Sequence, residues 1–207
     1  MGQQTASLER ASDALACVYP DTFADLYLSH WWKTYRWNQY VLRRVARAIY
    51  RGRGRVIVNA PPRFGKSFAT SRVIPTWTLN NWPDWRILLV AHTKDLAVDF
   101  GRTVRNEFRD NEDMDTILQE DSTAAGRWNT PDGGGMFCVG VGGAVTGKGA
   151  NVAIIDDPYP TYASAQSYRY RREVQEWFAG SLYNRIEPGG SIIVNHHRVH
   201  PNDLTGY

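Results

Sequence analysis

The sequence has little cysteine and no long apolar segment. Its 207 residues include two cysteines, Cys17 and Cys138, and their wide separation argues against a disulfide framework. No apolar run approaches the length that spans a bilayer, and the first residues lack the apolar stretch of a secretion signal. We therefore expect an intracellular protein that does not enter a membrane.

The sequence also lacks a strong charge of either sign. It has 24 lysines and arginines against 21 acidic residues, which leaves a formal net charge of +3. This mild charge is compatible with a nucleic-acid partner but is weak evidence for one. With 43% hydrophobic residues the chain is typical of globular proteins, and its length suits one α/β domain better than two. We predict a polar leader with a short helix over residues 1–30 and one folded domain over residues 31–207.

Short apolar segments alternate with longer segments of helical periodicity. Strands are predicted over residues 56–58, 86–91, 136–141, 151–157 and 191–195. Helices are predicted over residues 38–50, 68–79, 94–109 and 163–186. Buried strands alternating with helices predict an α/β fold, with a central, mostly parallel sheet flanked by helices on both faces. Ligands of such sheets bind beyond the carboxyl ends of the strands.

The predicted helix over residues 38–50 is amphipathic. Its apolar face is expected to contain Val41, Val45, Ala48 and Ile49. Its other side carries Arg43, Arg44, Arg47 and Arg51. This basic side either contacts nucleic-acid phosphates or is a solvated surface, and the sequence leaves both open. The aromatic residues that precede the helix, from Trp31 to Trp37, are expected to pack in the core.

The segment from Arg55 to Ser67 reads R-V-I-V-N-A-P-P-R-F-G-K-S, a β-branched run followed by a loop ending in Gly-Lys-Ser. A strand, such a loop and a helix are the context of a P-loop, whose backbone N–H groups and helix N-terminus bind phosphates. Lys66 is placed to reach the β- and γ-phosphates, and the Ser67 hydroxyl to bind Mg²⁺. A chance Gly-Lys-Ser in a turn is the alternative, because Ala60 stands where the usual motif begins with glycine. The predicted nucleotide-binding residues are Ala60, Pro61, Pro62, Arg63, Phe64, Gly65, Lys66 and Ser67.

Two adjacent carboxylates, Asp156 and Asp157, follow the apolar residues 152–155. Unpaired buried charges are costly, and a Mg²⁺ ion bound with a nucleotide would explain the pair. Asp156 is then predicted to hold Mg²⁺ through Ser67 and water, and Asp157 to orient or deprotonate the attacking water. The alternative is an Asp-Asp-Pro turn that caps the next segment. The separation of Lys66 and Asp156 leaves room for two strands, which fits P-loop NTPases in which another strand lies between the phosphate-loop strand and the acidic strand.

These motifs and those that follow them resemble the large subunit of tailed-bacteriophage terminase, a DNA-packaging motor. The resemblance covers roughly residues 32–207 and includes the order and spacing of the motifs. They are P-P-R-F-G-K-S at 61–67, G-V-G-G-A-V-T-G-K-G-A at 140–150, I-I-D-D-P at 154–158, Y-R-R-E-V-Q-E-W-F at 170–178, R-I-E-P-G-G-S-I-I-V at 185–194 and R-V-H-P-N-D-L-T-G at 198–206. The resemblance implies that ATP hydrolysis with Mg²⁺ drives double-stranded DNA into a procapsid. It also implies a homo-oligomeric ring on a portal protein, a small terminase subunit as partner, and the host cell cytoplasm as location.

The resemblance assigns roles to residues by position. Arg63 looks like the loop arginine that senses the γ-phosphate in cis, so the catalytic candidates are Arg63, Lys66 and Asp157. A solvent-facing loop arginine is the alternative. Gln39 lies where such motors read adenine, although a surface glutamine is the commoner case.

Two further positions depart from the family pattern. His197 falls where the family relays the γ-phosphate state to the DNA-gripping parts, a place that more often carries a small hydroxyl residue. Lys148 stands where an arginine more often acts in trans on a neighbour's nucleotide. The alternative for Lys148 is a residue that anchors a mobile loop.

The histidines near the end of the chain do not predict a metal site by themselves. His196, His197 and His200 have the spacing H-H-x-x-H and are followed by Asp203. This is not a standard zinc arrangement, and no cysteine lies nearby. We expect no metal site formed by these residues.

Members of the terminase family continue into an RNase H-like nuclease domain. We expect this chain to be a C-terminally incomplete ATPase domain without nuclease activity. Two other functions stay open. One is a helicase-type DNA translocase, and the other is a truncated remnant that binds nucleotide or partner subunits without turnover.

Overall fold

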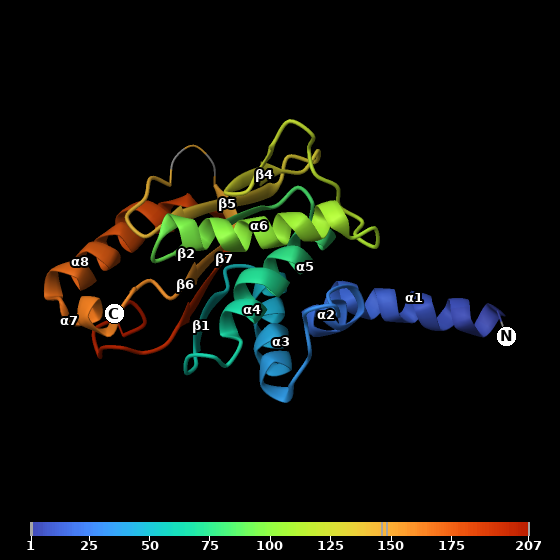
Figure 1. The fold of residues 1–207 in the computed structure, drawn as a ribbon, viewed down its shortest axis with the longest axis horizontal. Coiled ribbons are helices and arrows are strands. Elements are labelled where there is room, and N and C mark those ends of the chain that lie inside the picture. The colour runs from blue at the N-terminus through green and yellow to red at the C-terminus, as the bar shows by residue number, and fades with distance from the viewer. Residues whose placement is uncertain (1, 146, 148, 207) are drawn as a thin grey trace.

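The computed structural model describes residues 2–145, 147 and 149–206, and its chain trace is shown in Figure 1. The N-terminal part forms helices α1 (Gly2–Val18), α2 (Pro20–Tyr27) and α3 (Arg36–Arg51). Helix α1 is longer than the predicted short helix and projects from the rest of the molecule (Figure 1). None of the described helices has both the length and the apolar character needed to cross a bilayer.

A seven-stranded sheet forms the centre of the molecule. Its strands are β1 (Arg55–Asn59), β2 (Arg86–Ala91), β3 (Thr123–Ala124), β4 (Arg127–Asn129), β5 (Gly135–Gly140), β6 (Ala150–Asp156) and β7 (Ile186–His196). They are arranged in the order β1-β7-β6-β2-β5-β4-β3. Pairs β1–β7, β7–β6, β6–β2 and β2–β5 are parallel, whereas β4 and β3 add an antiparallel hairpin. The predicted mostly parallel sheet is confirmed, and β7 is the strand that separates the phosphate-loop strand β1 from the acidic strand β6.

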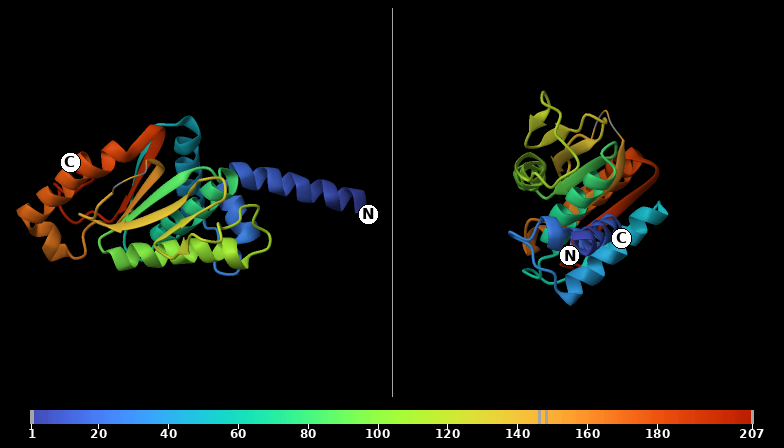
Figure 2. Two further views of the ribbon diagram at one scale, coloured as in Figure 1. Left: turned by 90° about the horizontal axis from the view of Figure 1, so that it is seen from above. Right: turned by 90° about the vertical axis from the view of Figure 1, so that its right-hand side faces the viewer.

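Helices cover both faces of this sheet, as predicted (Figure 2). The side chains of strand β2 alternate between two apolar clusters because successive residues of a strand point to opposite faces. Ile87 and Leu89 pack in the cluster of α3, α5 and α6, while Leu88 and Val90 pack in the cluster of α8 and η2. The remaining helical segments are α4 (Lys66–Phe68), η1 (Ala69–Val73), α5 (Ile74–Asn81), α6 (Lys94–Asp110), α7 (Tyr162–Gln166), α8 (Tyr168–Trp177), η2 (Phe178–Leu182) and η3 (Tyr183–Arg185).

The helix after the phosphate loop is not interrupted at Pro75. It continues from α4 through the π-helical segment η1 into α5, and Pro75 occupies the start of α5. By contrast, the single helix predicted over residues 163–186 is wrong. Ser167 is extended, and its hydroxyl accepts a hydrogen bond from the Tyr170 N–H at 3.3 Å, which caps a new helix. The chain therefore forms α7 and α8 there, and residue 186 already belongs to β7.

The apolar face of α3 is rotated relative to the prediction. Its buried apolar residues are Leu42, Val45, Ala46 and Ile49. Val41 and Ala48 are half-buried. The aromatic residues before α3 divide between core and surface. Trp32 is buried at 8% exposure, but Tyr35 is 58% exposed because it occupies the N-cap of α3.

Candidate functional site

The predicted P-loop, residues 60–67, is called the phosphate loop below. It joins β1 to α4 at the carboxyl edge of the sheet, where β6 and β7 also end. Two of its residues have left-handed backbone, Arg63 with φ 66° and Gly65 with φ 73°. Glycine adopts this conformation freely, whereas for arginine it is strained. Ala60 does not have a positive φ, which explains why alanine can stand in the place of the motif's first glycine.

Lys66 turns from the start of the helix toward the acidic strand. Its side chain is only 6% exposed, and its Nζ lies 2.6 Å from Oδ2 of Asp157. The cation that is predicted to bind the β- and γ-phosphates is therefore paired with the carboxylate that is predicted to activate water. A phosphate bound at this loop would compete with Asp157 for the Lys66 ammonium group.

Asp156 is almost fully buried, with 1% of its surface exposed. The Ser67 hydroxyl donates to its Oδ1 at 3.0 Å, and the Ser71 hydroxyl donates to its Oδ2 at 2.6 Å. The Asn195 side-chain amide donates to Oδ1 at 2.8 Å. Burial raises the pKa of Asp156 to about 6, and Asp157 adds to this rise, although the serine hydrogen bonds oppose it. Because Asp156 has no ion-pair partner among the described residues, its carboxylate is suited to bind a divalent ion.

Asp157 has a left-handed backbone, with φ 41°, and its side chain points away from Asp156 toward Lys66 and the end of β7. Its Oδ1 accepts a hydrogen bond from the His197 backbone N–H at 3.0 Å and lies 2.9 Å from the ring Nδ1 of the same residue. Burial acts to raise the pKa of Asp157, but contacts with His196 and Lys66 outweigh it. The hydrogen bonds from His197 lower this pKa further, so Asp157 is ionised.

Sequence reasoning missed two residues of this site, Ser71 and Asn195. Ser71 lies one helical turn after Ser67 on the same helix, so the helical period contained the signal. Asn195 is paired in register with Asp156 on the neighbouring strand. Its place depends on the strand order, which the sequence did not define.

Other predicted site residues lie outside this cluster. Arg63 is exposed and has no hydrogen-bonding or ionic partner within the described residues. The Gln39 amide donates to Asp21 at 2.9 Å, and no described contact links it to the phosphate loop. The contact of Gln39 with adenine stays a prediction, as do the roles of Arg63 and His197. Lys148 lies outside the residues that the structure describes.

Exposed aromatic rings flank the phosphate loop on the side of α3. Phe64, in the loop itself, is 54% exposed, and its ring centroid lies 6.3 Å from that of Trp37 in the first turn of α3. Pro61 and Pro62 are also exposed. The loop is therefore open to solvent on its outer side, and only Lys66 and Ser67 turn inward.

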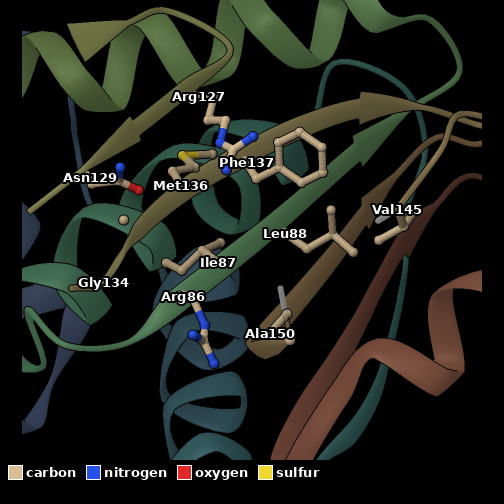
Figure 3. Close-up of a pocket in the computed structure, with 12 residues that line it drawn as sticks. Arg86, Ile87, Leu88, Arg127, Asn129, Gly134, Met136, Phe137, Val145 and Ala150 are labelled. Carbon is tan, nitrogen blue, oxygen red and sulfur yellow. The ribbon is translucent and has the colours of Figure 1, made fainter. Parts of the chain in front are cut away.

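A separate small pocket lies at the amino ends of β2, β5 and β6, at the opposite edge of the sheet (Figure 3). Its lining is mostly apolar and includes Ile87, Leu88 and Phe137. Its volume of about 40 Å³ is far below the roughly 300–1,000 Å³ of ligand pockets. We therefore place the candidate functional site at the phosphate loop and not in this pocket.

Comparisons with known proteins identify the family of the chain. The family model described as "Terminase large subunit, T4likevirus-type, N-terminal" matches residues 57–177, which contain the phosphate loop and both carboxylates. The solved structure titled "Crystal structure of the HK97 bacteriophage large terminase" is similar, with a TM-score of 0.58 and 13% sequence identity. The similarity covers 84% of this chain and 35% of the HK97 chain, so this chain spans about a third of that protein.

At this low identity the structural similarity shows the fold alone, a mixed α/β fold with a mostly parallel sheet flanked by helices. No curated protein matches the chain. The family match, by contrast, covers more than half of the 207 residues. The chain therefore belongs to the family of T4-type terminase large subunits, in the N-terminal part of these proteins.

Proposed function

We propose that this chain is a Mg²⁺-dependent ATPase whose hydrolysis of ATP drives the packaging of double-stranded DNA. One observation carries the proposal. The two P-loop side chains Lys66 and Ser67 meet the two carboxylates Asp157 and Asp156 at 2.6 Å and 3.0 Å. These four residues come from segments far apart in the sequence, and P-loop hydrolysis uses these residue types together.

Phosphate binding is assigned to the loop and to Lys66. The helix that starts at Lys66 presents free backbone N–H groups to the loop, which favours anions there. Lys66 leaves Asp157 for the β- and γ-phosphates, since a triphosphate offers it more negative charge than one carboxylate. Arg63 is exposed, unpaired within the described residues and close in sequence, so it is free to bind the γ-phosphate as well.

The oxygen-rich surroundings of Asp156 fit Mg²⁺, which prefers carboxylate, hydroxyl and water oxygens. Ser67 would bind the ion directly, and Asp156 would hold it through Ser67 and water. The side-chain Oδ1 of Asn195 is buried without a hydrogen-bond partner, which adds one more oxygen beside this carboxylate. Bound Mg²⁺ would neutralise negative charge on the phosphates.

Asp157 is the residue assigned to the attacking water. Once Lys66 has moved to the phosphates, one carboxylate oxygen of Asp157 is free to accept a hydrogen bond from water. The water oxygen attacks the γ-phosphorus, the bond to the leaving ADP oxygen breaks, and Asp157 accepts the proton of the water. The His197 backbone N–H keeps the other carboxylate oxygen in place during this exchange.

Partners are proposed from family membership together with the surface of α3. Double-stranded DNA, a portal protein, a small terminase subunit and further copies of this chain in a ring are the proposed partners, in the host cytoplasm. Arg36, Arg47 and Arg51 of α3 are exposed and have no acidic partner within the described residues, so this helix offers positive charge to DNA phosphates.

Phosphate release from ATP tests the proposal. We expect release that requires Mg²⁺, stops when the ion is chelated, and increases when double-stranded DNA is added. The surface variant Lys94→Ala serves as the control and should retain the native rate. A folded chain that releases no phosphate under any of these conditions would contradict the proposed ATPase. In that case saturable ATP binding would support a nucleotide-binding remnant instead.

A further inference from the structure

Three potential metal ligands converge where β6 and β7 end. They are Oδ1 of Asp157 and ring nitrogens of His196 and His197, and all three atoms lie within 4.8 Å of one another. The sequence spacing of the histidines gave no reason to expect a site, because the aspartate comes from the neighbouring strand. This group is distinct from the Ser67–Asp156 pair assigned to Mg²⁺.

His196 supplies a second observation that points to a ligand. It is fully buried, at 0% exposure, and its Nδ1 makes no hydrogen bond with any residue that the structure describes. This nitrogen faces Oδ1 of Asp157 at 3.4 Å, while Nε2 lies 3.2 Å from Oδ2 of Asp203. If Nε2–H donates to Asp203, then Nδ1 presents a lone pair to another acceptor, which is unfavourable in a buried place. A cation between Nδ1 and Asp157 would remove this conflict.

Asp203 is placed as an outer partner of such a cation site. It is fully buried and accepts backbone hydrogen bonds from Val199, His200 and Thr205 at 3.1–3.2 Å. Metal-binding histidines commonly donate their second ring N–H to a carboxylate, which fixes the ring and its tautomer. The contact between Asp203 and His196 has this form, and it directs Nδ1 toward Asp157.

We propose that Asp157, His196 and His197 bind a transition-metal ion such as Zn²⁺. Imidazole nitrogens suit zinc and its neighbours and not Mg²⁺. Oδ1 of Asp157 lies 2.9 Å from Nδ1 of His197 and 3.4 Å from Nδ1 of His196. Ligand atoms of a tetrahedral zinc are separated by roughly 3.3–3.5 Å, given metal–ligand distances of about 2.0–2.2 Å. Small movements of these side chains would therefore complete the site.

The surroundings allow this ion to bind. Asp157 and His197 are 23% and 32% exposed, so one side of the group faces solvent and can provide a fourth ligand. Lys66 opposes a cation, but it contacts Oδ2 of Asp157 and leaves Oδ1 to the histidines. Zinc at this place would bind Asp157, the carboxylate assigned to hydrolysis. The proposed zinc site does not depend on whether the chain hydrolyses ATP.

Metal binding to the nucleotide-free chain tests the proposal. The chain is freed of metal with a chelator, then titrated with Zn²⁺ in a calorimeter and with Co²⁺ in a spectrophotometer. We expect one saturable site and the visible absorption of tetrahedral cobalt. His197→Ala should weaken binding more than tenfold, and Asp203→Asn about 10- to 100-fold through the outer contact. His30→Ala, which removes an exposed imidazole elsewhere, should leave the affinity unchanged.

His197 is chosen for substitution because it is half-exposed, whereas a substitution of the buried His196 can prevent folding. Circular dichroism would first establish that His197→Ala has the native helix content. The proposal is overturned if no saturable binding occurs. That result is expected if both ring nitrogens of His196 carry a proton, because one N–H would then face Asp157 and the other Asp203. It is also overturned if folded His197→Ala binds zinc as tightly as the native chain. Neither outcome bears on ATP hydrolysis, because no nucleotide is present.

Discussion

At the scale of single residues, one contact would connect the proposed phosphate binding to the proposed hydrolysis. Lys66 and Asp157 are paired at 2.6 Å, so the proposed role of each requires this contact to weaken. A bound triphosphate competes with Asp157 for Lys66. ATP binding would thus release the carboxylate that hydrolysis needs.

Asp157→Asn tests this exchange. The amide cannot accept a proton from the attacking water, so we expect the turnover rate to fall by about 10²- to 10⁴-fold. ATP binding should be retained, because Lys66 no longer has to leave a carboxylate. Phosphate release and equilibrium binding measure the two quantities separately. Native turnover in this variant would show that Asp157 is not the base.

Ser71→Ala tests the hydrogen bonds of Asp156. The substitution removes the donor at 2.6 Å from a buried carboxylate and should lower the free energy of unfolding by about 1–3 kcal/mol. Urea denaturation followed by circular dichroism measures this change. The control is Ser29→Ala, at an exposed position, where we expect a change within about 0.5 kcal/mol. Equal stability of the two variants would count against the role assigned to Ser71.

At the element scale, the packing of α6 on the sheet depends on Gly101. A Cβ at this position would lie 2.5 Å from Sγ of Cys138 and 2.7 Å from the carbonyl oxygen of Ala125. Real Cβ atoms essentially never come so close to other heavy atoms. The glycine therefore determines how closely α6 approaches β5.

Gly101→Ala should destabilise the fold by about 1–3 kcal/mol through overpacking, although alanine usually stabilises a helix by about 1 kcal/mol relative to glycine. Thermal unfolding measures the difference. Gly180→Ala is the matched control, because a Cβ there meets no atom within 4 Å. We expect it to be neutral or stabilising. A stabilising Gly101→Ala would mean that α6 does not pack so closely on β5.

Also at the element scale, the sequence predicted most strands and helices but less of the site. The strand over residues 86–91 agrees with β2 because each of its residues is apolar except Arg86, as expected for a strand buried on both faces. The boundary at Ser167 was missed because its cause is one side-chain cap inside a helical pattern. The contact of Asp203 with His196 was not predicted, because its buried partners depend on how the chain folds after β7.

At the scale of the whole molecule, the strand order determines the site. Strand β7 lies between β1 and β6, and this brings Asn195, His196 and His197 beside residues of the phosphate loop and the acidic strand. The order follows from long-range pairing, which one sequence does not reveal. The separation of phosphate-loop strand and acidic strand was nevertheless predicted from their distance along the chain.

Every proposed step depends on the binding of a nucleoside triphosphate by the phosphate loop. The most direct test is a calorimetric titration of the chain with Mg²⁺ and a non-hydrolysable ATP analogue, repeated with Lys66→Ala and with the diphosphate. We predict saturable binding of the analogue that Lys66→Ala weakens by more than tenfold, with a smaller loss for the diphosphate, because Lys66 is proposed to contact the γ-phosphate. Unchanged binding in a folded Lys66→Ala variant, or equal losses for both nucleotides, would show that Lys66 does not bind the γ-phosphate.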